Sequence, residues 1–205
     1  MEGLARTSQA NLAAMIDKSS VAFIICDPNL PDTPIIHCNT AFIELTGYDR
    51  DEIIGHNCRF LAGPETEADK SQKLADAIRE HQPVLVHLTN HKKDGTPFCN
   101  AVMISPILGD EGELAYFLGS QLEVPLNAKS AVTSRNKLAT KLVKKLSPQQ
   151  KRVLTLVAKG YMNKQIAHDL AISERTVKMH RAEAFAKLKV ATTAEAIRLA
   201  VEAGL

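Results

Sequence analysis

The sequence predicts an α+β domain followed by an all-α domain, and three observations support this fold class. Short β-rich runs separated by turn residues fill much of residues 19–124, whereas capped segments of helical period fill residues 147–205. The charged residues are also distributed unevenly between the two parts of the chain. Residues 1–123 hold 9 Lys and Arg against 18 Asp and Glu, a net of −9, and residues 124–205 hold 16 against 5, a net of +11. This split predicts two domains that attract each other, the basic one facing nucleic acid, although charge that only keeps two domains soluble remains an alternative.

We expect four segments: a helical lead-in over residues 1–18, the α+β domain over 19–124, a linker with a connector helix over 125–146, and the helical domain over 147–205. The start of the chain has no basic stretch followed by a long apolar run, so no signal peptide is expected. No apolar run is long enough to span a membrane. The four cysteines match no zinc spacing, and a reducing compartment disfavours disulfides. We therefore expect a soluble, cytoplasmic protein without a metal site or a membrane partner.

The elements of the first domain follow in order. A buried strand is predicted by VAFIICD, which ends at the turn DPNLPDTP, and a second short strand by IIHCN. A helix is predicted by NTAFIELTGY, and a short capped helix by Asp49 with Glu52 three residues on. A further helix is expected over residues 66–81, with Leu74, Ala77 and Ile78 inward.

Three more strands follow this helix. Two lie in PVLVHLTNHKKDGTPFCNAVMISPI, around an Asp-Gly hairpin signal, and the third is LAYFLGSQLEV, after the turn GDEGE. Five antiparallel strands with helices make an α+β unit.

The second domain is expected to contain four helices. Leu138, Leu142 and Leu146 recur at every fourth residue, so the linker should end as a helix. The first helix of the domain begins at SPQQ, a capping box with proline at its first position, and ends near residue 160. The second covers residues 163–170, the third is capped by a serine and ends near 188, and the last begins at a Thr–Glu capping box and ends near 203.

The second and third helices are joined by a three-residue turn, which is the helix-turn-helix plan. On a helical wheel Val177, Ala184 and Leu188 form the buried face of the third helix, while the opposite face is cationic at its start and small-sided further along. Small side chains let a helix enter a major groove, and residues at its start reach base edges. An ordinary amphipathic helix would give a similar wheel, so the pattern alone leaves a structural role open.

This segment, NKQIAHDLAISERTVKMHRAEAFAKL, resembles the DNA-binding domain of LuxR-type transcription factors over about residues 144–205. The resemblance implies base contacts from the third helix and phosphate contacts around it, with double-stranded DNA as the partner. The implied DNA-binding residues are Lys164, Arg175, Thr176, Lys178, Met179 and Arg181.

The last helix has apolar residues on two faces, and its charges form one thin stripe. One face holds Ile197, Ala200 and Val201. A surface helix needs only one buried face, so the second face, formed by Ala196, Leu199 and Ala203, predicts a partner. In the LuxR-type family this helix dimerises, which implies a homodimer on two DNA half-sites.

In the first domain, a thiol lies between an amide and a guanidinium in GHNCRFLAG. Cysteine usually behaves as a small buried hydrophobe, whereas Asn57 and Arg59 suit a polar or anionic molecule beside the sulfur of Cys58. The stretch resembles the G-x-NCRFL-x motif of LOV (light, oxygen, voltage) domains, which are PAS domains. The resemblance extends over about residues 20–123 through DPNLPDTPI, HKKDGTPFCNAV and YFLGSQLEV. A structural thiol in a PAS domain that binds something else is the alternative.

The resemblance implies FMN as the cofactor and Cys58 as the group that bonds reversibly to it in light. It implies that Arg59 pairs with the phosphate and that Gln121 lies near a ring nitrogen that gains a proton. The Gln121 amide must then reorient, because its oxygen and nitrogen have opposite hydrogen-bonding roles. The implied cofactor-binding residues are Asn57, Cys58, Arg59, Leu61, Asn90, Asn100, Phe117 and Gln121.

Three positions depart from the LOV pattern. Ala62, Ala75 and Val102 stand where glutamine, arginine and an aromatic residue are frequent. The change at Ala75 removes a second phosphate contact, which Lys73 or Arg79 would have to replace.

Together the resemblances predict a blue-light-activated transcriptional regulator that is not an enzyme. In the dark the acidic domain should hold the basic domain, mask its last helix and keep the chain monomeric. In light the Cys58–FMN bond should release the basic domain, which dimerises, binds DNA and acts with RNA polymerase. A PAS-type redox or ligand sensor controlling the same domain remains the alternative. A cysteine-dependent enzyme with His56 as base lacks an identifiable orienting residue, and no kinase nucleotide-binding segment is present.

Overall fold

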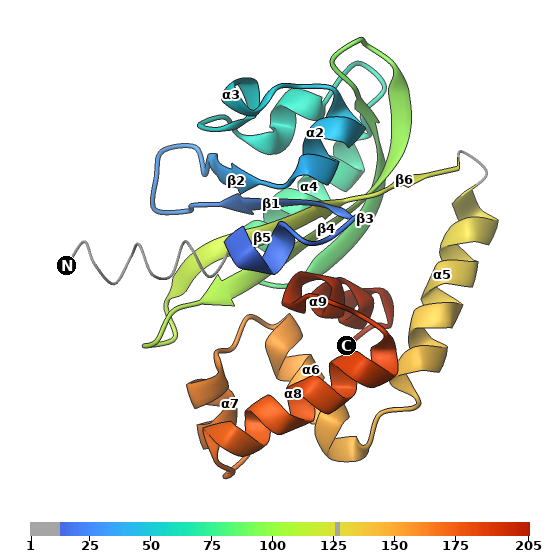
Figure 1. The fold of residues 1–205 in the computed structure, drawn as a ribbon. Helices are drawn as coiled ribbons and strands as arrows, with labels where there is room; N and C mark the ends of the chain where they lie inside the picture. The colour runs from blue at the N-terminus through green and yellow to red at the C-terminus, as the bar shows by residue number, and fades with distance from the viewer. Residues whose placement is uncertain (1–12, 126–127) are drawn as a thin grey trace.

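The computed structural model describes residues 13–125 and 128–205, with side chains over 13–125 and 135–205 (Figure 1). Residues 13–16 of the expected lead-in are helical, and the rest of that lead-in lies outside the described residues. The strands are β1 (Ala22–Cys26), β2 (Ile35–Cys38), β3 (Val84–His91), β4 (Pro97–Leu108), β5 (Leu114–Gln121) and β6 (Glu123–Val124). The helices are α2 (Thr40–Thr46), α3 (Arg50–Ile53), the 3-10 helix η1 (Cys58–Leu61), α4 (Ala68–Arg79), α5 (Ala128–Val143), α6 (Pro148–Ala158), α7 (Asn163–Asp169), α8 (Glu174–Leu188) and α9 (Thr193–Glu202).

One antiparallel sheet forms the centre of the first domain, in the order β2-β1-β5-β4-β3. The two-residue strand β6 also pairs with β4, so the predicted five strands are confirmed and a short sixth is added. The chain passes from β2 to β3 through α2, α3, η1 and α4, which all cover one face of the sheet (Figure 1). The predicted α+β and all-α fold classes are both confirmed.

Local chemistry explains how these helices begin and end. Asn39 precedes α2, and its side-chain oxygen accepts hydrogen bonds from the backbone N–H groups of Phe42 and Phe23, which ties the helix to β1. Gly47 ends α2 in the left-handed region at φ 76°. The side chain of Glu52 accepts from the backbone N–H of Asp49 at 2.9 Å, as the capping pattern predicted.

The four helices α6 to α9 make the second domain. The predicted capping boxes at the starts of α6 and α9 are both present. The turn between α7 and α8 bends at Ala171, whose φ is 51°. The predicted inward face of α8 is confirmed, because Val177, Ala184 and Leu188 are all buried.

The connector helix α5 is present, and the predicted leucine repeat is partly buried. Leu146, just after the helix, is buried, and Leu142 packs against the core of the helical domain. Ala139 and Val143 are also buried, whereas Leu138 is 57% exposed. The period of four therefore predicted the helix correctly but identified only part of its inward side.

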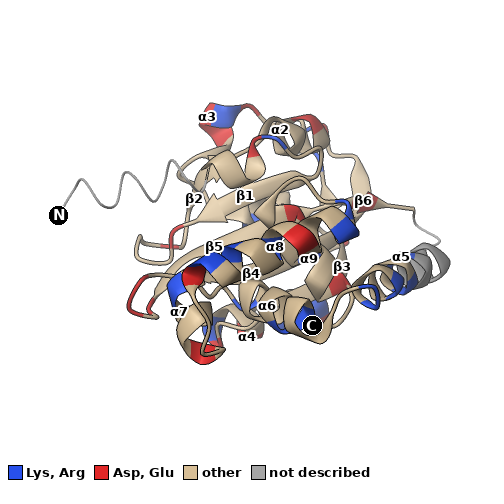
Figure 2. Cartoon of the chain, turned by 60° about the horizontal axis from the view of Figure 1, so that its bottom comes forward, with Lys and Arg blue, Asp and Glu red and all other residues tan. Residues whose placement is uncertain are grey.

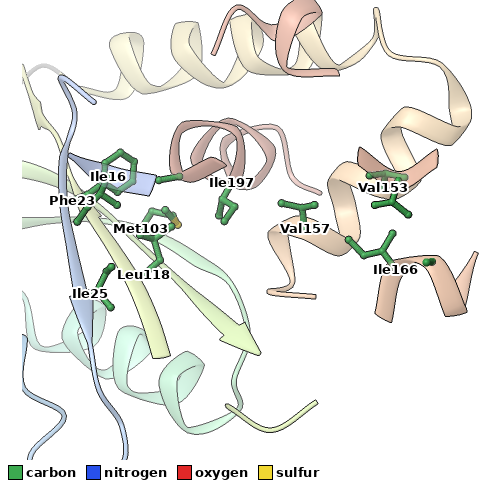
Figure 3. Close-up of a cluster of buried hydrophobic side chains, with 12 residues drawn as sticks. Ile16, Phe23, Ile25, Met103, Leu118, Val153, Val157, Ile166 and Ile197 are labelled. Atoms are coloured by element: carbon green, nitrogen blue, oxygen red, sulfur yellow. The ribbon is translucent and has the colours of Figure 1, made fainter. Parts of the chain in front are cut away.

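The second domain lies against the sheet face that α2, α3, η1 and α4 leave uncovered. The last helix α9 lies at this junction, between the sheet and α6 (Figure 1). Figure 3 shows Ile197 of α9 between Met103 of the sheet and Val157 of α6. One continuous apolar cluster joins the two domains: Ile16, Phe23, Ile25, Met103, Leu118, Val153, Val157, Ile166, Ala167, Val177, Ala194 and Ile197.

Candidate functional site

A cavity of about 410 Å³ lies between the covered face of the sheet and the segments η1 and α4. This volume lies within the range of small-molecule and cofactor sites. The helix α4 has no fully buried residue, and its predicted inward residues Leu74, Ala77 and Ile78 are only half-buried. Leu74 and Ile78 line the cavity, while Leu74 and Ala77 also pack against buried residues of β3 and β4.

The alternating direction of side chains along β5 determines which of its residues face the cavity. Side chains of successive strand residues point to opposite faces of a sheet. Phe117, Gly119 and Gln121 line the cavity, while Leu118 belongs to the cluster on the other face. Gly119 also permits close packing, because a Cβ at that position would lie 2.8 Å from the Ile24 side chain.

The thiol of Cys58 lies at the start of η1, in the cavity wall. Its nearest polar partner is Gln121, whose Nε2 lies 3.5 Å from Sγ. Burial raises the pKa of the Cys58 thiol to about 12, so the group is protonated at neutral pH. A protonated thiol is a poor nucleophile, so Cys58 is not activated by its protein surroundings alone.

A network of amides forms the polar end of the cavity. Asn90 lines the cavity and donates through Nδ2 to the Leu61 carbonyl at 3.1 Å. Asn100 is fully buried behind it and donates to Asn90 Oδ1 at 2.9 Å. The backbone N–H of Leu122 in turn donates to Asn100 Oδ1 at 3.1 Å. These contacts fix the Asn90 amide beside the end of β5.

One polar atom in the cavity wall has no partner among the described residues. The Oε1 atom of Gln121 is buried and accepts no hydrogen bond. Buried polar atoms are nearly always hydrogen-bonded, so an orphan acceptor facing a cavity indicates a ligand with a donor. This atom, the amide network and the apolar walls fit a flat heteroaromatic cofactor with polar edges.

The mouth of the cavity holds Asn57 and Arg59. The Nδ2 of Asn57 donates to the Asp32 carbonyl at 2.6 Å, and its Oδ1 accepts from the Arg59 backbone N–H at 3.0 Å. The Arg59 guanidinium pairs with the Asp32 carboxylate, and both side chains are more than half exposed.

The structure brings most of the predicted cofactor residues together. Those that line the cavity are Asn57, Cys58, Arg59, Asn90, Phe117 and Gln121. Leu61 and Asn100 do not line it, and each instead forms a hydrogen bond with Asn90. Sequence reasoning missed Ile24 and Cys26, although their spacing of two on a strand next to β5 could have placed them on the same face. Contacts with a flavin stay a prediction.

On the opposite face of β5, Ser120 contacts the second domain. Arg198 of α9 is 3% exposed, and one of its terminal nitrogens donates to Ser120 Oγ at 2.5 Å. The other donates to the Ala101 carbonyl at 3.2 Å, and Nε donates to Glu202 at 2.8 Å. Arg135 of α5 pairs with the same carboxylate at 2.9 Å. Ser120 precedes Gln121, so one peptide bond joins the cavity wall to this junction.

Further hydrogen bonds join the two domains along the same face. Ser105 Oγ donates to the Ala158 carbonyl at 2.7 Å. Ser19 Oγ donates to Glu195 at 2.7 Å. The Gln165 amide donates to the Gly109 carbonyl at 2.8 Å, which places the β4–β5 turn against α7.

This turn and α7 enclose a second cavity of about 380 Å³. Asp110 and Glu111 of the turn line it together with Lys164 and His168 of α7. Asp169 of α7 lines it too, so Lys164, a predicted phosphate contact, shares this cavity with three carboxylates.

The residues predicted to contact DNA separate into two groups. Lys164, Arg175, Lys178 and Met179 are exposed, and Thr176 is half-buried beside its capping partner Ser173. Figure 2 shows the cationic positions along α7 and α8. Arg181 differs, because its guanidinium donates to Asn163 at 2.6 Å and to Thr193 at 3.0 Å. Arg175, Lys178 and Met179 are thus free to meet a ligand, and Lys164 is exposed beside acidic residues. Arg181 instead holds α7, α8 and α9 together.

The two apolar faces of α9 meet different surfaces. The residues predicted for dimerisation, Ala196, Leu199 and Ala203, pack in the core of the helical domain, and Ala196 is fully buried. Ile197 belongs to the cluster shared with the sheet. The dimerisation role of the first three stays a prediction, and the structure adds that the face with Ile197 and Arg198 is the one the sheet covers.

Comparison with known families gives two matches. The PAS domain family matches residues 20–124, just over half of the chain. The chain belongs to this family. Bacterial regulatory proteins of the luxR family match residues 144–200.

Relatives narrow the first domain to the LOV type. The chain is 46% identical over 107 residues to a blue-light-activated histidine kinase 1 of Erythrobacter litoralis, and 44% identical over 113 residues to phototropin-2 of Oryza sativa. These matches cover 52% and 55% of the chain but only 30% and 12% of the relatives.

Solved structures also indicate that the first domain is of the LOV type. The light state of the blue-light photoreceptor Aureochrome1 LOV matches with a TM-score of 0.53 and 35% identity, covering 62% of this chain and 96% of that one. A Rhodobacter sphaeroides LOV protein matches with a TM-score of 0.58 and 30% identity, covering 67% and 79%. The chain is thus a LOV domain fused to a LuxR-type helix-turn-helix domain.

Two kinds of feature are absent from the residues that the structure describes. None of the helices in residues 13–125 and 128–205 combines the length and the apolar character needed to cross a membrane. In the same part of the chain, no group of three or more His, Cys, Asp or Glu residues is arranged to hold a metal ion.

Proposed function

We propose that this chain is a blue-light-activated, DNA-binding transcriptional regulator in which the LOV domain restrains the helix-turn-helix domain. The observation that carries the proposal is the arrangement around β5. Gln121 lies 3.5 Å from the Cys58 thiol on one face of the sheet, and the preceding Ser120 holds Arg198 of α9 on the other face.

The cofactor we propose for the cavity is FMN. The fit rests on the cavity volume, the orphan acceptor of Gln121 and the amide of Asn90. When bound, a flavin supplies light absorption and a ring carbon that becomes electrophilic on excitation. The chain would supply a protonated, desolvated thiol at Cys58 able to add to that carbon, with the thiol proton passing to the adjacent ring nitrogen.

The signal then passes through Gln121. Its side-chain oxygen can only accept a hydrogen bond and its nitrogen can only donate, so proton gain by a neighbouring atom forces the amide to reorient. Reorientation removes the 3.5 Å contact with Cys58 and shifts the end of β5. Because Ser120 is the next residue, the shift weakens its hydrogen bond with Arg198 and loosens the junction.

The closed arrangement opposes DNA binding in two ways. The sheet covers the face of α9 that includes Ile197 and Arg198, which prevents pairing of two chains through that surface. The carboxylates of Asp110 and Glu111 share a cavity with Lys164 and repel a DNA phosphate there. Release removes both obstacles.

We propose that the dark chain is monomeric and that the lit chain dimerises through α9, where Leu199 and Ala203 are half-buried and Ala196 is fully buried. The dimer binds double-stranded DNA through the exposed residues of α7 and α8 and acts with RNA polymerase in the cytoplasm. No enzymatic reaction is proposed, because Cys58 reacts only with the chain's own cofactor.

The test combines a spectrum with a DNA-binding assay, each in dark and light. We expect a structured flavin band that bleaches in blue light and recovers, together with higher DNA affinity in light. Cys58→Ala should abolish both light effects and leave the dark values unchanged. Cys99→Ala, a half-buried thiol that does not line the cavity, is the matched control and should behave like wild type.

Two outcomes would contradict the proposal. A purified protein without a flavin band would favour the redox or ligand sensor. A band that bleaches with no change in DNA affinity would leave the photochemistry without its proposed output.

A further inference from the structure

The mouth of the LOV cavity carries almost no net positive charge. Among the residues that line the cavity, all within the described part of the chain, Arg59 is the single Lys or Arg. A phosphate monoester carries about 1.5 to 2 negative charges near neutral pH, so this one guanidinium would have to compensate most of that charge.

Arg59 already has an acidic partner. Its terminal nitrogen lies 2.5 Å and 2.6 Å from the two oxygens of Asp32. Asn57 binds the backbone carbonyl of Asp32 at 2.6 Å, which fixes the loop that carries the carboxylate. A bound phosphate would therefore share Arg59 with an anion of like charge.

The facing helix α4 offers no second cation. Ala75 lines the cavity with a side chain that ends at Cβ. Ser71 also lines it, but its hydroxyl donates to the Glu67 carbonyl at 3.1 Å. Arg79, one of the two residues that could replace a second phosphate contact, pairs with Asp76 and does not line the cavity. Lys73, the other, does not line it either.

Solvent exposure weakens the remaining phosphate contact, the one with Arg59. The Arg59 side chain is 66% exposed and the Asp32 side chain 59% exposed. Ion pairs at exposed positions contribute little, because water and salt screen them. The walls that bind the ring are enclosed by comparison, and they include Phe117, Val102 and Asn90, each less than a tenth exposed.

We infer that this cavity recognises a flavin through its ring and sugar chain and discriminates little for the phosphate, so that riboflavin binds nearly as tightly as FMN. The inference rests on the proposed function, because it takes the ligand to be a flavin. An exposed pair that is shared with Asp32 should give FMN an advantage of less than about fivefold. Ala75 and Asp32 then set the phosphate selectivity of the site.

The test titrates flavin-free full-length protein with riboflavin and with FMN, using quenching of flavin fluorescence. Wild type should favour FMN by less than about fivefold. Ala75→Arg adds a cation to the mouth, and Asp32→Asn frees Arg59. Each variant should raise the ratio of FMN affinity to riboflavin affinity by a further factor of about three and lose most of that gain in high salt. Gln72→Arg, on the same helix but outside the cavity lining, is the matched control and should leave the preference unchanged.

A wild-type preference for FMN above about fivefold would overturn the inference while leaving the photoreceptor proposal intact. A preference unchanged by both Ala75→Arg and Asp32→Asn would also overturn it. If neither flavin binds, the proposed function itself fails, and this inference fails with it.

Discussion

The two faces of the central sheet differ in what fills them. One face borders a cavity of about 410 Å³ walled by polar and apolar side chains, and the other packs tightly against α9 and the helical domain. Both faces are built from alternate residues of the same strands, such as Gln121 and Ser120 of β5. A structural change on the cavity face therefore needs no long pathway to reach the face packed against α9, because the two environments are one residue apart along β5.

The largest effect is expected from a substitution that separates the helical domain from the sheet face that it covers. Met103 of β4 is fully buried in the shared cluster, where a lysine would place an unpaired charge. Such burial costs several kcal/mol, whereas a separated sheet face leaves the charge in water. We expect Met103→Lys to raise the dark DNA affinity by at least about tenfold, measured by fluorescence anisotropy.

The neighbouring residue on the same strand is the control for this substitution. Val102 faces the cavity, so Val102→Thr should leave the dark DNA affinity unchanged. Met103→Lys must retain the flavin band and its bleaching, which shows that the LOV domain still folds. Dark DNA affinity equal to wild type in a folded Met103→Lys protein would refute the restraining role of the sheet.

Substitutions of Gln121 and of Ser120 should change DNA affinity in different ways. Gln121→Leu keeps the side-chain size but removes the reorienting amide, so Cys58 should still react while the light-induced rise in DNA affinity falls by about tenfold, a typical coupling free energy. Ser120→Ala removes a hydrogen bond to a charged group and should act in the opposite sense, raising DNA affinity in the dark. Equal responses of the two variants would show that the faces are not distinct.

The smallest expected effect concerns pH. Burial first, and then the nearby Arg198 charge, lower the pKa of His87 on β3 below its usual 6.5, with Lys70 also lowering it and Glu202 opposing. The closed form therefore binds fewer protons than the open form. The contribution of neutral His87 to the stability of the closed form is complete above pH 6.5 and declines as pH falls below that value.

Dark DNA affinity should accordingly rise between pH 7.5 and pH 5.5, by less than the roughly tenfold change that one pKa unit produces. His87→Gln should lose this part of the pH dependence, compared with wild type at both pH values by the same anisotropy assay. A pH dependence that is the same in wild type and His87→Gln would exclude His87 as its source.

Much of the fold was predictable because its signals are local. The capping boxes at Ser147 and Thr192, the end of α2 at Gly47 and the buried face of α8 all depend on residues within a few positions of each other. The cluster of Cys58 with Gln121 was expected only because motifs resembled a known family, since these residues lie 63 positions apart.

The remaining features depend on contacts between domains, which no local pattern encodes. Both faces of α9 are apolar, and only the packed structure shows that the sheet covers Ile197 while the helical core covers Ala196. The regular leucine spacing likewise predicted the connector helix but not that Ala139 would be buried while Leu138 is exposed. Cys26 on β1 is buried like an ordinary packing residue, and it also lines the cavity.

The central claim, that chemistry at Cys58 releases α9 from the sheet, is tested most directly by hydrogen exchange of residues 193–202 in dark and light. We predict that the amides of α9 and those of β4 and β5 that face it lose protection on illumination. In Cys58→Ala they should keep it. The helix α2, which lies on the cavity side and does not contact α9, serves as the internal reference (Figure 1). If the flavin band of wild type bleaches and the protection of α9 stays at its dark level, the account is contradicted.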